Sequence, residues 1–365
     1  MTQLALTQLK LSHFRSHKAS EINCDARPVA IFGPNGAGKT NILEAVSLFS
    51  PGRGIRRASA QDMTRRPEAL GWKLNGLLKT SEGLQEVETW SDGGAARQVK
   101  INDKSAPQTK LGSLCRVIWL IPAMDRLWIE GAEGRRRFLD RTALSFFPDH
   151  AEAALTYEKT MRERNRLLKE QIRDAHWYKA LEDQMAKCAA KIHVNRQATL
   201  AQLREAQTQT TTAFPVASLG LIQADGDSPE SEDAFRDAFA ESRSRDLMAG
   251  RTLVGPHRSD LSASYTAKDV PAADCSTGEQ KALLISLILA NARALADGVG
   301  TPPILLLDEV AAHLDADRRA ALYDELIALK AQAWMTGTED HLFDALGDRA
   351  QYLTVTENDG VSALA

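Results

Sequence analysis

Cysteine is scarce in this chain, and the four that occur are far apart. They stand at positions 24, 115, 188 and 275 of 365 residues, and no C-x-x-C pair is present. Zinc clusters need closely spaced thiolates, and disulfide frameworks are typical of small secreted chains, so neither is favoured. The pattern instead predicts a protein of the reducing cytoplasm.

An excess of charge of one sign is also absent. The 45 Lys+Arg residues oppose 48 Asp+Glu residues, which leaves a net charge of −3 and an isoelectric point of about 6.3. A basic field over the whole molecule, which marks many nucleic-acid-binding proteins, is therefore excluded. Any contact with DNA has to be local.

Long apolar runs are missing as well. Stretches such as residues 282–290 fall well short of the ~20 residues that span a bilayer. Residues 1–10 also lack the basic start and apolar run of a signal peptide. We therefore expect neither secretion nor membrane insertion, and no membrane partner. The content of 43% hydrophobic and 25% charged residues is typical of a globular protein.

Glycine is absent from residues 135–209, where Arg, Lys, Glu, Ala and Leu dominate. This composition predicts helix, and a turn near residues 172–179 would give two antiparallel helices. An acidic polar stretch at 224–233 is expected to form a mobile loop. On either side of the helical segment the sequence is strand-like, with antiparallel hairpins expected over 72–121 and a buried strand over 303–308.

The clearest motif is G-P-N-G-A-G-K-T, which follows the short apolar run Val29–Phe32 and precedes an amphipathic segment. It matches the phosphate-loop pattern G-x-x-x-x-G-K-[ST]. The glycines let consecutive backbone N–H groups face phosphates, and the positive end of the next helix adds to the attraction. A chance glycine-rich turn is the alternative. The residues predicted to bind nucleotide are Gly33, Pro34, Asn35, Gly36, Ala37, Gly38, Lys39 and Thr40.

ATP and Mg²⁺ are the predicted cofactors of this loop. Lys39 is expected to reach the β and γ phosphate oxygens, and Thr40 to ligate Mg²⁺. The apolar run at 304–307 ends in two acids, of which Asp308 is predicted to hold Mg²⁺ and Glu309 to polarise the attacking water. Lys39 and Glu309 are therefore the catalytic candidates. Taken alone, the two acids would equally suit the end of an ordinary strand.

A third motif, C-S-T-G-E-Q at 275–280, precedes a strongly apolar segment. It resembles the signature of the ATP-binding-cassette (ABC) family at Ser276, Gly278 and Glu279, and departs from it at Cys275 and Thr277. In that family the signature contacts the γ-phosphate held by the opposite subunit. The resemblance implies an ATP-dependent homodimer with shared nucleotide sites. Without it, the motif is simply a good helix N-cap.

The same resemblance locates further positions. Residues 311–315 fall where the family has its D-loop, which makes His313 and Asp315 interface candidates, with a helix cap as the competing role of Asp315. Thr336 or Thr338 would have to serve where transporter cassettes carry a switch histidine. Residues 122–125 occupy the Q-loop region without a glutamine. These departures argue against the transporter branch.

Over almost its whole length the sequence resembles the RecF family of bacterial recombination mediators. The matching segments are residues 9–16, the phosphate loop, R-R-R-F-L-D at 135–140 and V-G-P-H-R-S-D-L at 254–261. The resemblance implies a weak DNA-dependent ATPase that acts in gap repair with RecO and RecR and promotes loading of RecA. It also places Arg15 near the base or phosphates of ATP.

Local arginine clusters are compatible with contacts to double-stranded, single-stranded or gapped DNA, because phosphates are neutralised by local charge. A solvated face with salt bridges is the alternative for each cluster. The DNA-binding candidates are Arg53, Arg56, Arg57, Arg65, Arg66, Arg135, Arg136 and Arg137.

These observations predict an α/β fold, a P-loop NTPase head of ABC/SMC type with an antiparallel β subdomain, interrupted by an α-helical lobe. The head is expected at 1–125 and 246–365 and the lobe at 126–245, which is too short for the coiled-coil arms of SMC proteins. The hypothesis is a homodimer that clamps DNA with ATP bound and opens after slow hydrolysis. A transporter motor, a non-enzymatic scaffold and an SMC-like DNA organiser are the alternatives.

Overall fold

The chain folds into two units. The computed structural model describes residues 3–223 and 229–364, so the first half of the acidic stretch expected to be a mobile loop, 224–228, lies outside the described residues. Unit 1 comprises Met1–Asp125, Ala206–Val216 and Ser276–Ala365. Unit 2 comprises Arg126–Glu205 and Ala217–Cys275, so residues 246–275 group with the inserted segment.

Unit 1 contains a mainly parallel sheet in the strand order β15-β14-β3-β13-β12-β8. Its strands are β3 (Val29–Phe32), β8 (Val117–Leu120), β12 (Ile304–Leu307), β13 (Ala333–Gly337), β14 (Gln351–Asn358) and β15 (Val361–Leu364). Only β15 runs antiparallel to its neighbour. The central strands β3, β13 and β12 are buried, which explains why they are short apolar runs without alternation. The buried strand predicted over 303–308 is confirmed as β12, and the short apolar run at 29–32 forms β3.

A second sheet of unit 1 is antiparallel, in the order β2-β1-β4-β5-β6-β7. Its strands are β1 (Ala5–Phe14), β2 (His17–Asn23), β4 (Trp72–Thr80), β5 (Gly83–Ser91), β6 (Gln98–Ile101) and β7 (Lys104–Ser105). The antiparallel hairpins expected over 72–121 are present up to β7. The prediction is wrong for β8, which pairs in parallel with β12.

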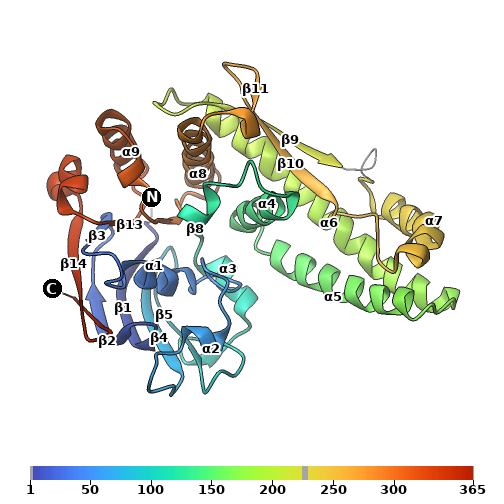
Figure 1. Cartoon of the computed structure of the whole chain (residues 1–365), viewed down its shortest axis with the longest axis horizontal. Helices are drawn as coiled ribbons and strands as arrows, with labels where there is room; N and C mark the ends of the chain where they lie inside the picture. Colours follow the sequence, from blue (N-terminus) through green and yellow to red (C-terminus); the bar gives the residue numbers. More distant parts are fainter. Residues whose placement is uncertain (1–2, 224–228, 365) are drawn as a thin grey trace. The chain divides into compact units, whose positions relative to one another are not determined.

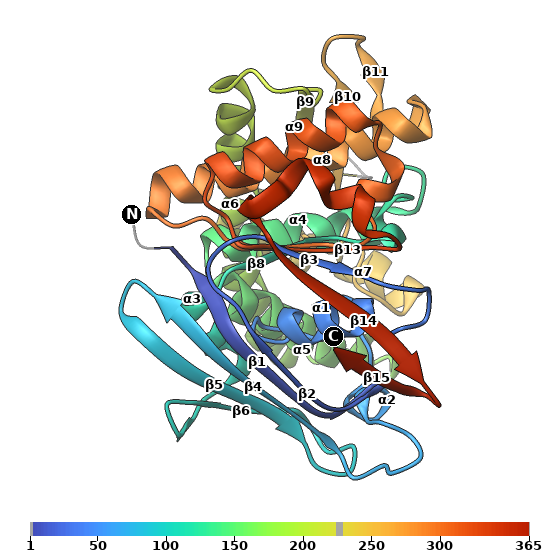
Figure 2. The ribbon, with the colours of Figure 1, turned by 90° about the vertical axis from the view of Figure 1, so that its left-hand side faces the viewer.

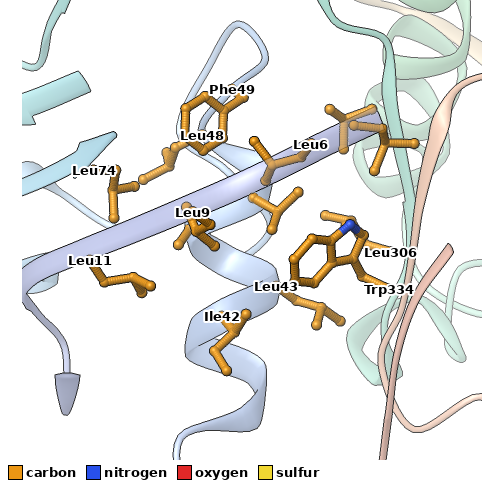
Figure 3. Close-up of a cluster of buried hydrophobic side chains, with 14 of the residues drawn as sticks. Leu6, Leu9, Leu11, Ile42, Leu43, Leu48, Phe49, Leu74, Leu306 and Trp334 are labelled. Carbon is orange, nitrogen blue, oxygen red and sulfur yellow. The ribbon is translucent and has the colours of Figure 1, made fainter. Parts of the chain in front are cut away.

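Helix α1 (Lys39–Ser47) lies between the two sheets of unit 1 (Figure 2). Ile42 and Leu43 of α1 pack in one buried cluster with Leu9 of β1 and with Leu306 and Trp334 of the parallel sheet (Figure 3). Burying one such side chain stabilises the fold by about 2 kcal/mol. The helix that follows the phosphate loop is therefore fixed on two sides.

Helices α8 (Thr277–Val299) and α9 (Ala316–Ala328) cover the other face of the parallel sheet (Figure 2). Within the described residues, α8 is the one helix long and apolar enough to cross a membrane, and 72% of its apolar window is buried inside the fold. Short helical segments complete unit 1: α2 (Ala60–Met63), η1 (Gln108–Lys110), α3 (Leu111–Leu114), η2 (Pro122–Met124), η4 (Ala311–His313) and η5 (Asp340–Arg349).

Unit 2 combines helices with a small sheet (Figure 1). Its elements are α4 (Ala132–Phe146), α5 (His150–Lys169), α6 (Ala175–Thr208, whose last turn belongs to unit 1), β9 (Ala217–Gln223), α7 (Glu232–Ala249), β10 (Ser259–Tyr265), β11 (Val270–Pro271) and η3 (Ala272–Asp274). Ion pairs of Asp149 with Lys191 and of Arg164 with Glu182 confirm that α5 and α6 are antiparallel. Helix α7, strand β9 and the pairing of β9, β10 and β11 in a three-stranded sheet were not expected from the sequence.

A buried arginine holds the helices of unit 2 together. Arg164 of α5 is fully buried and pairs with Glu182 of α6 at 3.0 Å and with Asp246 of α7 at 2.7 Å. Its guanidinium also donates to the hydroxyl of Thr252. Removing one partner from such a buried set leaves an uncompensated charge and costs about 3–5 kcal/mol.

Candidate functional site

The phosphate loop connects β3 to α1 and is shaped by two glycines. Gly33 has φ +149°, and a Cβ there would lie 2.1 Å from the carbonyl oxygen of Val355 on β14. Gly38, the N-cap of α1, has φ +103° in the left-handed region. A side chain at either position would displace the loop. Between them Pro34, Asn35 and Gly36 are exposed and Ala37 is buried.

Lys39 lies over the loop that precedes it. Its ammonium donates to the carbonyl oxygens of Gly33 at 2.7 Å and Pro34 at 2.8 Å. Burial lowers the pKa of Lys39, while the nearby carboxylates of Glu309 and Asp308 oppose this shift. The predicted lysine and the two predicted acids are thus brought into one electrostatic environment.

The acidic end of β12 meets the phosphate loop. The carboxylate of Asp308, 6% exposed, accepts hydrogen bonds from the Thr40 hydroxyl at 3.0 Å and from the Thr336 hydroxyl at 2.7 Å. The Thr336 oxygen in turn accepts the backbone N–H of Glu309 at 3.0 Å. Glu309 has φ +54°, a left-handed conformation that is uncommon for a residue with a side chain. Two threonine hydroxyls therefore join the phosphate loop to both acids, and the other candidate, Thr338, is exposed.

The donor set around Thr40 fits Mg²⁺. Magnesium takes oxygen ligands and is usually held by one or two protein oxygens together with phosphates and water. The hydroxyl of Thr40 and the carboxylate of Asp308 supply such oxygens in direct contact. Within the described part of the chain, no group of three or more His, Cys, Asp or Glu side chains is placed to hold an ion. An ion at this point would therefore share its coordination with a bound phosphate.

The predicted signature stands at the exposed start of α8. Ser276 caps the helix by accepting the N–H of Glu279 at 3.4 Å, and the Glu279 carboxylate accepts the N–H of Ser276 at 2.9 Å. Ser276, Thr277 and Gly278 are exposed, and a Cβ on Gly278 would meet no atom within 4 Å. The N-cap interpretation is confirmed. The positive end of a 23-residue helix is open on this side.

Two other predicted positions lie near β12. Asp315 is the N-cap of α9 and accepts the N–H of Arg318 at 2.8 Å, so the competing helix-cap role is confirmed. His313 ends η4 and is exposed. Both face solvent in the single chain, and their interface role stays a prediction.

Arg15 forms a salt bridge with a glutamate of α1, and its expected place near the base or phosphates of ATP stays a prediction. It has φ +55° and makes a two-pronged salt bridge with Glu44, at 2.8 and 2.7 Å. Glu44 is fully buried and also pairs with Arg56 at 3.0 Å. Arg56 further donates to the side chain of Asn41 at 2.6 Å. Two predicted arginines therefore converge on one carboxylate, one helical turn from Thr40.

The arginine clusters differ in how far they are engaged inside the protein. Arg65 is buried and donates to the carbonyl oxygens of Ser16 at 2.9 Å and Gly360 at 2.7 Å. Arg135 in unit 2 forms a two-pronged salt bridge with Asp260, at 2.8 Å for both contacts. Others are engaged more loosely: Arg136 donates to the Ser259 carbonyl and Arg137 pairs with Glu133. Arg53, Arg57 and Arg66 are exposed.

The segment 254–261, which carries part of the family resemblance, contains a turn of unit 2 that is held by His257. Burial lowers the pKa of His257 to about 4, so the imidazole is neutral. Its Nδ1 lies 2.8 Å from the Tyr157 hydroxyl and its Nε2 lies 3.0 Å from the carbonyl oxygen of Thr252. Gly255 has φ +127°, and a Cβ there would come 2.3 Å from the Tyr157 oxygen. His257 therefore holds the turn that contains Gly255.

A set of side chains that the sequence did not indicate supports the phosphate loop on the side of its carbonyl groups. Ser16 and His17 follow β1, Ser362 lies on β15, and all three contact the loop or its neighbours. The only sequence signal was indirect: Ser16 and His17 border the segment 9–16 that carries the family resemblance. Nothing in the sequence marks Ser362.

A parallel α/β core with a phosphate loop, an acidic strand end and an exposed signature helix defines the class of P-loop NTPase heads of ABC/SMC type. A family model described as the RecF/RecN/SMC N terminal domain matches residues 5–362. The DNA replication and repair protein RecF of Rhizobium etli is 46% identical over 366 residues, covering 97% of this chain and 98% of the relative. RecF of Rhizobium meliloti is 45% identical over 361 residues, covering 96% of each. The chain belongs to the RecF family.

Solved structures agree on the fold. A structure described as the recombination mediator protein RecF-ATP in the RecFOR pathway has a TM-score of 0.83 at 23% identity, covering 99% of this chain and 98% of that chain. The Smc head domain of Pyrococcus furiosus with an extended coiled coil has a TM-score of 0.57 at 16% identity, covering 99% and 96%. The predicted ABC/SMC head fold is confirmed.

Proposed function

We propose that this protein is an ATP-switched DNA clamp of gap repair and recombination. Two copies bind Mg-ATP, close on each other around the nucleotides and hold DNA, and slow hydrolysis then reopens them. The relatives are described as DNA replication and repair proteins, and a structural neighbour as a recombination mediator of the RecFOR pathway. We accordingly propose RecO and RecR as partners, gapped DNA as the substrate, and promotion of RecA loading as the outcome. Four free cysteines suit a cytoplasmic location.

In this proposal the phosphate loop binds the triphosphate. Backbone N–H groups after Gly36 and the positive end of α1 attract the phosphates, and Lys39 moves from the loop carbonyls to the β and γ oxygens. The exchange is favourable because the ammonium replaces two neutral acceptors with charged ones.

The acidic end of β12 performs the chemistry. Thr40 and Asp308 would hold a magnesium ion, which would offset charge on the β and γ phosphates. Glu309 accepts a hydrogen bond from the attacking water and orients it in line with the phosphate, while the Asp308 and Thr336 contacts fix the backbone at Glu309. The metal-binding role and the water-activating role therefore fall on consecutive residues, Asp308 and Glu309.

The exposed signature makes the second copy necessary. Ser276 and Gly278 present a hydroxyl and N–H groups at the open end of α8, which suits the γ-phosphate on another copy of the chain. In that arrangement Glu279 keeps the cap formed and His313 and Asp315 lie at the interface. Each nucleotide site then needs residues of both copies, so ATP binding controls dimerisation.

DNA contact is assigned to the exposed arginines. Arg53, Arg57 and Arg66 are free to reach phosphates from the surface of unit 1, and they supply local positive charge on a chain of net charge −3. Arg65 and Arg135, in contrast, are used inside the protein. The proposed DNA-binding surface therefore contains fewer arginines than the candidates taken from the sequence.

The observation that carries the proposal is the 3.0 Å contact between Thr40 and Asp308, with Glu309 next to it. The test is the solution mass of a Glu309→Gln variant by light scattering, with and without Mg-ATP and a short gapped duplex. We expect an ATP-dependent shift from monomer to a dimer that retains the duplex. The same shift should be lost in Glu309→Gln combined with Ser276→Arg. A monomer under all conditions would contradict the clamp and favour the scaffold alternative.

A further inference from the structure

Two buried side chains hold consecutive peptide units of the phosphate loop by their carbonyl groups. The hydroxyl of Ser362 lies 2.6 Å from the carbonyl oxygen of Ala37, and Nε2 of His17 lies 3.2 Å from that of Gly38. Ser362 is 2% exposed and His17 is 0% exposed. Neither residue belongs to the phosphate-loop motif.

The hydrogen atoms can be assigned along this set. Asn41 Nδ2 donates to the Ser16 oxygen at 2.7 Å, the Ser16 hydroxyl donates to the Ser362 oxygen at 2.6 Å, and the Ser362 hydroxyl then donates to Ala37. Burial lowers the pKa of His17, which favours the neutral ring. With Ser20 donating to Nδ1 at 2.9 Å, Nε2 carries the hydrogen that faces Gly38. Every hydroxyl donates once, so both carbonyl contacts are satisfied.

The direction of these contacts matters for phosphate binding. In a trans peptide the carbonyl group and the following N–H group point in opposite directions. Holding the carbonyls of Ala37 and Gly38 towards Ser362 and His17 therefore turns the N–H groups of Gly38 and Lys39 to the opposite side of the loop. A phosphate site of this kind needs consecutive N–H groups on one side.

The support is itself rigidly attached to the head. The backbone N–H of Ser362 donates to the Ser16 carbonyl at 2.9 Å, which joins β15 to the turn between β1 and β2. Arg65 holds the same turn to Gly360 at the tip of the β14–β15 hairpin. A Cβ on Gly38 would come 2.3 Å from the Ser362 oxygen, so the contact between hairpin and loop is close packed.

We propose that Ser362 and His17 are positioning residues that hold the phosphate loop with its amides turned towards the triphosphate. The proposal rests on the proposed nucleotide binding and adds to it a role for the β14–β15 hairpin. It assigns the hairpin to the support of the nucleotide site, through the contact of Ser362 with the loop carbonyl of Ala37.

The test is equilibrium binding of Mg-ATP to the full chain carrying Ser362→Ala. We expect affinity to fall about fivefold, which corresponds to ~1 kcal/mol. The matched control is Ser91→Ala, because Ser91 is a buried serine of β5 that donates to the Ala95 carbonyl at the same 2.6 Å. The midpoint temperature of thermal unfolding should shift by a similar amount in both variants, while ATP affinity should fall only in Ser362→Ala.

A second pair of variants tests the same idea at His17. His17→Leu removes the N–H donor and is expected to weaken ATP binding about fivefold, the effect of one lost hydrogen bond. His17→Gln places an amide N–H near the position of Nε2 and should restore affinity to within about twofold of wild type. This pair carries the test if Ser362→Ala does not fold.

The outcomes separate the two proposals. Wild-type protein that binds no Mg-ATP would refute the proposed function and this inference with it. Wild-type protein that binds Mg-ATP, together with Ser362→Ala and His17→Leu variants that bind it equally well, would refute only the positioning role.

Discussion

The hydroxyl of Thr336 accepts the backbone N–H of Glu309 at 3.0 Å while it donates to Asp308 at 2.7 Å. One side chain of β13 thus connects the acid proposed to hold magnesium with the backbone of the acid proposed to orient water. Because Glu309 has φ +54°, its conformation is costly and persists only when neighbouring contacts hold it.

Replacing Thr336 by valine should therefore slow hydrolysis more than it weakens binding. Thr336→Val keeps the shape of the side chain but removes both hydrogen bonds, one of them to a charged group, so we expect a loss of roughly 10- to 100-fold in the hydrolysis rate. Thr336→Ser retains the hydroxyl and should stay near the wild-type rate. Single-turnover hydrolysis and equilibrium ATP binding, measured side by side, check this. A valine variant with the wild-type rate would show that Thr336 is only a packing residue.

Removing the ammonium of Lys39 should abolish useful ATP affinity without unfolding the head. The group is proposed to make charge-assisted bonds to the β and γ phosphates, and their loss is expected to weaken binding roughly 100-fold. Lys79→Ala, an exposed lysine of β4, is the matched control and should bind normally. Isothermal titration with Mg-ATP gives the affinity. Retained affinity in Lys39→Ala would contradict the assignment of the phosphate loop.

The exposed arginines should contribute to DNA affinity in a salt-dependent way. For the double variant Arg53→Gln, Arg57→Gln we expect weaker duplex binding and a salt dependence whose slope falls by about 1 for each lost phosphate contact. Arg162→Gln, an exposed arginine on α5 of unit 2, is the control and should leave the slope unchanged. Fluorescence anisotropy across a salt series measures both. An unchanged slope in the double variant would remove these arginines from the DNA surface.

Arg65 should behave in the opposite way, although it stands beside Arg66 in the sequence. Its guanidinium is bound to the carbonyls of Ser16 and Gly360. Arg65→Gln should therefore lower thermal stability and ATP affinity while leaving the salt dependence of DNA binding as it is. A fall in the salt slope without loss of stability would instead place Arg65 on the DNA.

Acid should destabilise unit 2 through His257. Its pKa is lowered from 6.5 to about 4 in the folded protein, so the unfolded chain binds the proton more readily between these values. Stability from the neutral ring is therefore present above pH 6.5 and is lost as the pH falls towards 4. Between pH 7 and pH 5 the loss is about 2 kcal/mol. Urea unfolding of wild type and His257→Gln at both pH values checks this, because the variant should lose less stability by about that amount.

Local patterns were enough to predict which groups come together at the candidate site. The phosphate loop and the pair Asp308 and Glu309 each lie on a contiguous stretch that follows a buried strand, so their placement at one sheet edge follows from the parallel topology. The N-cap at Ser276 was predictable for the same reason, since its partner Glu279 is three residues away.

Contacts between distant segments were not predictable. Arg135 belongs to a run of three arginines, and only the fold reveals that Asp260 of β10 neutralises it. Helix α7 escaped notice because its apolar face is small, although Phe235 and Phe239 stand one turn apart, Ser231 caps its start and Gly250 ends it in the left-handed region. The sequence of 72–121 did not show that β8 belongs to the parallel sheet, because a four-residue apolar strand has the same pattern in a parallel and in an antiparallel sheet.

The close approach of Gly33 to Val355 also affects how the phosphate loop forms while the chain is being synthesised. During synthesis the phosphate loop leaves the ribosome hundreds of residues before β14 and β15, which sit against its back. Contacts between such distant segments form late in folding. A nascent chain that already contains the whole loop therefore lacks the strands that shape it. If β14 and β15 position the loop as proposed, we expect nucleotide binding only after these strands have joined the head, so that unfinished chains should not bind ATP.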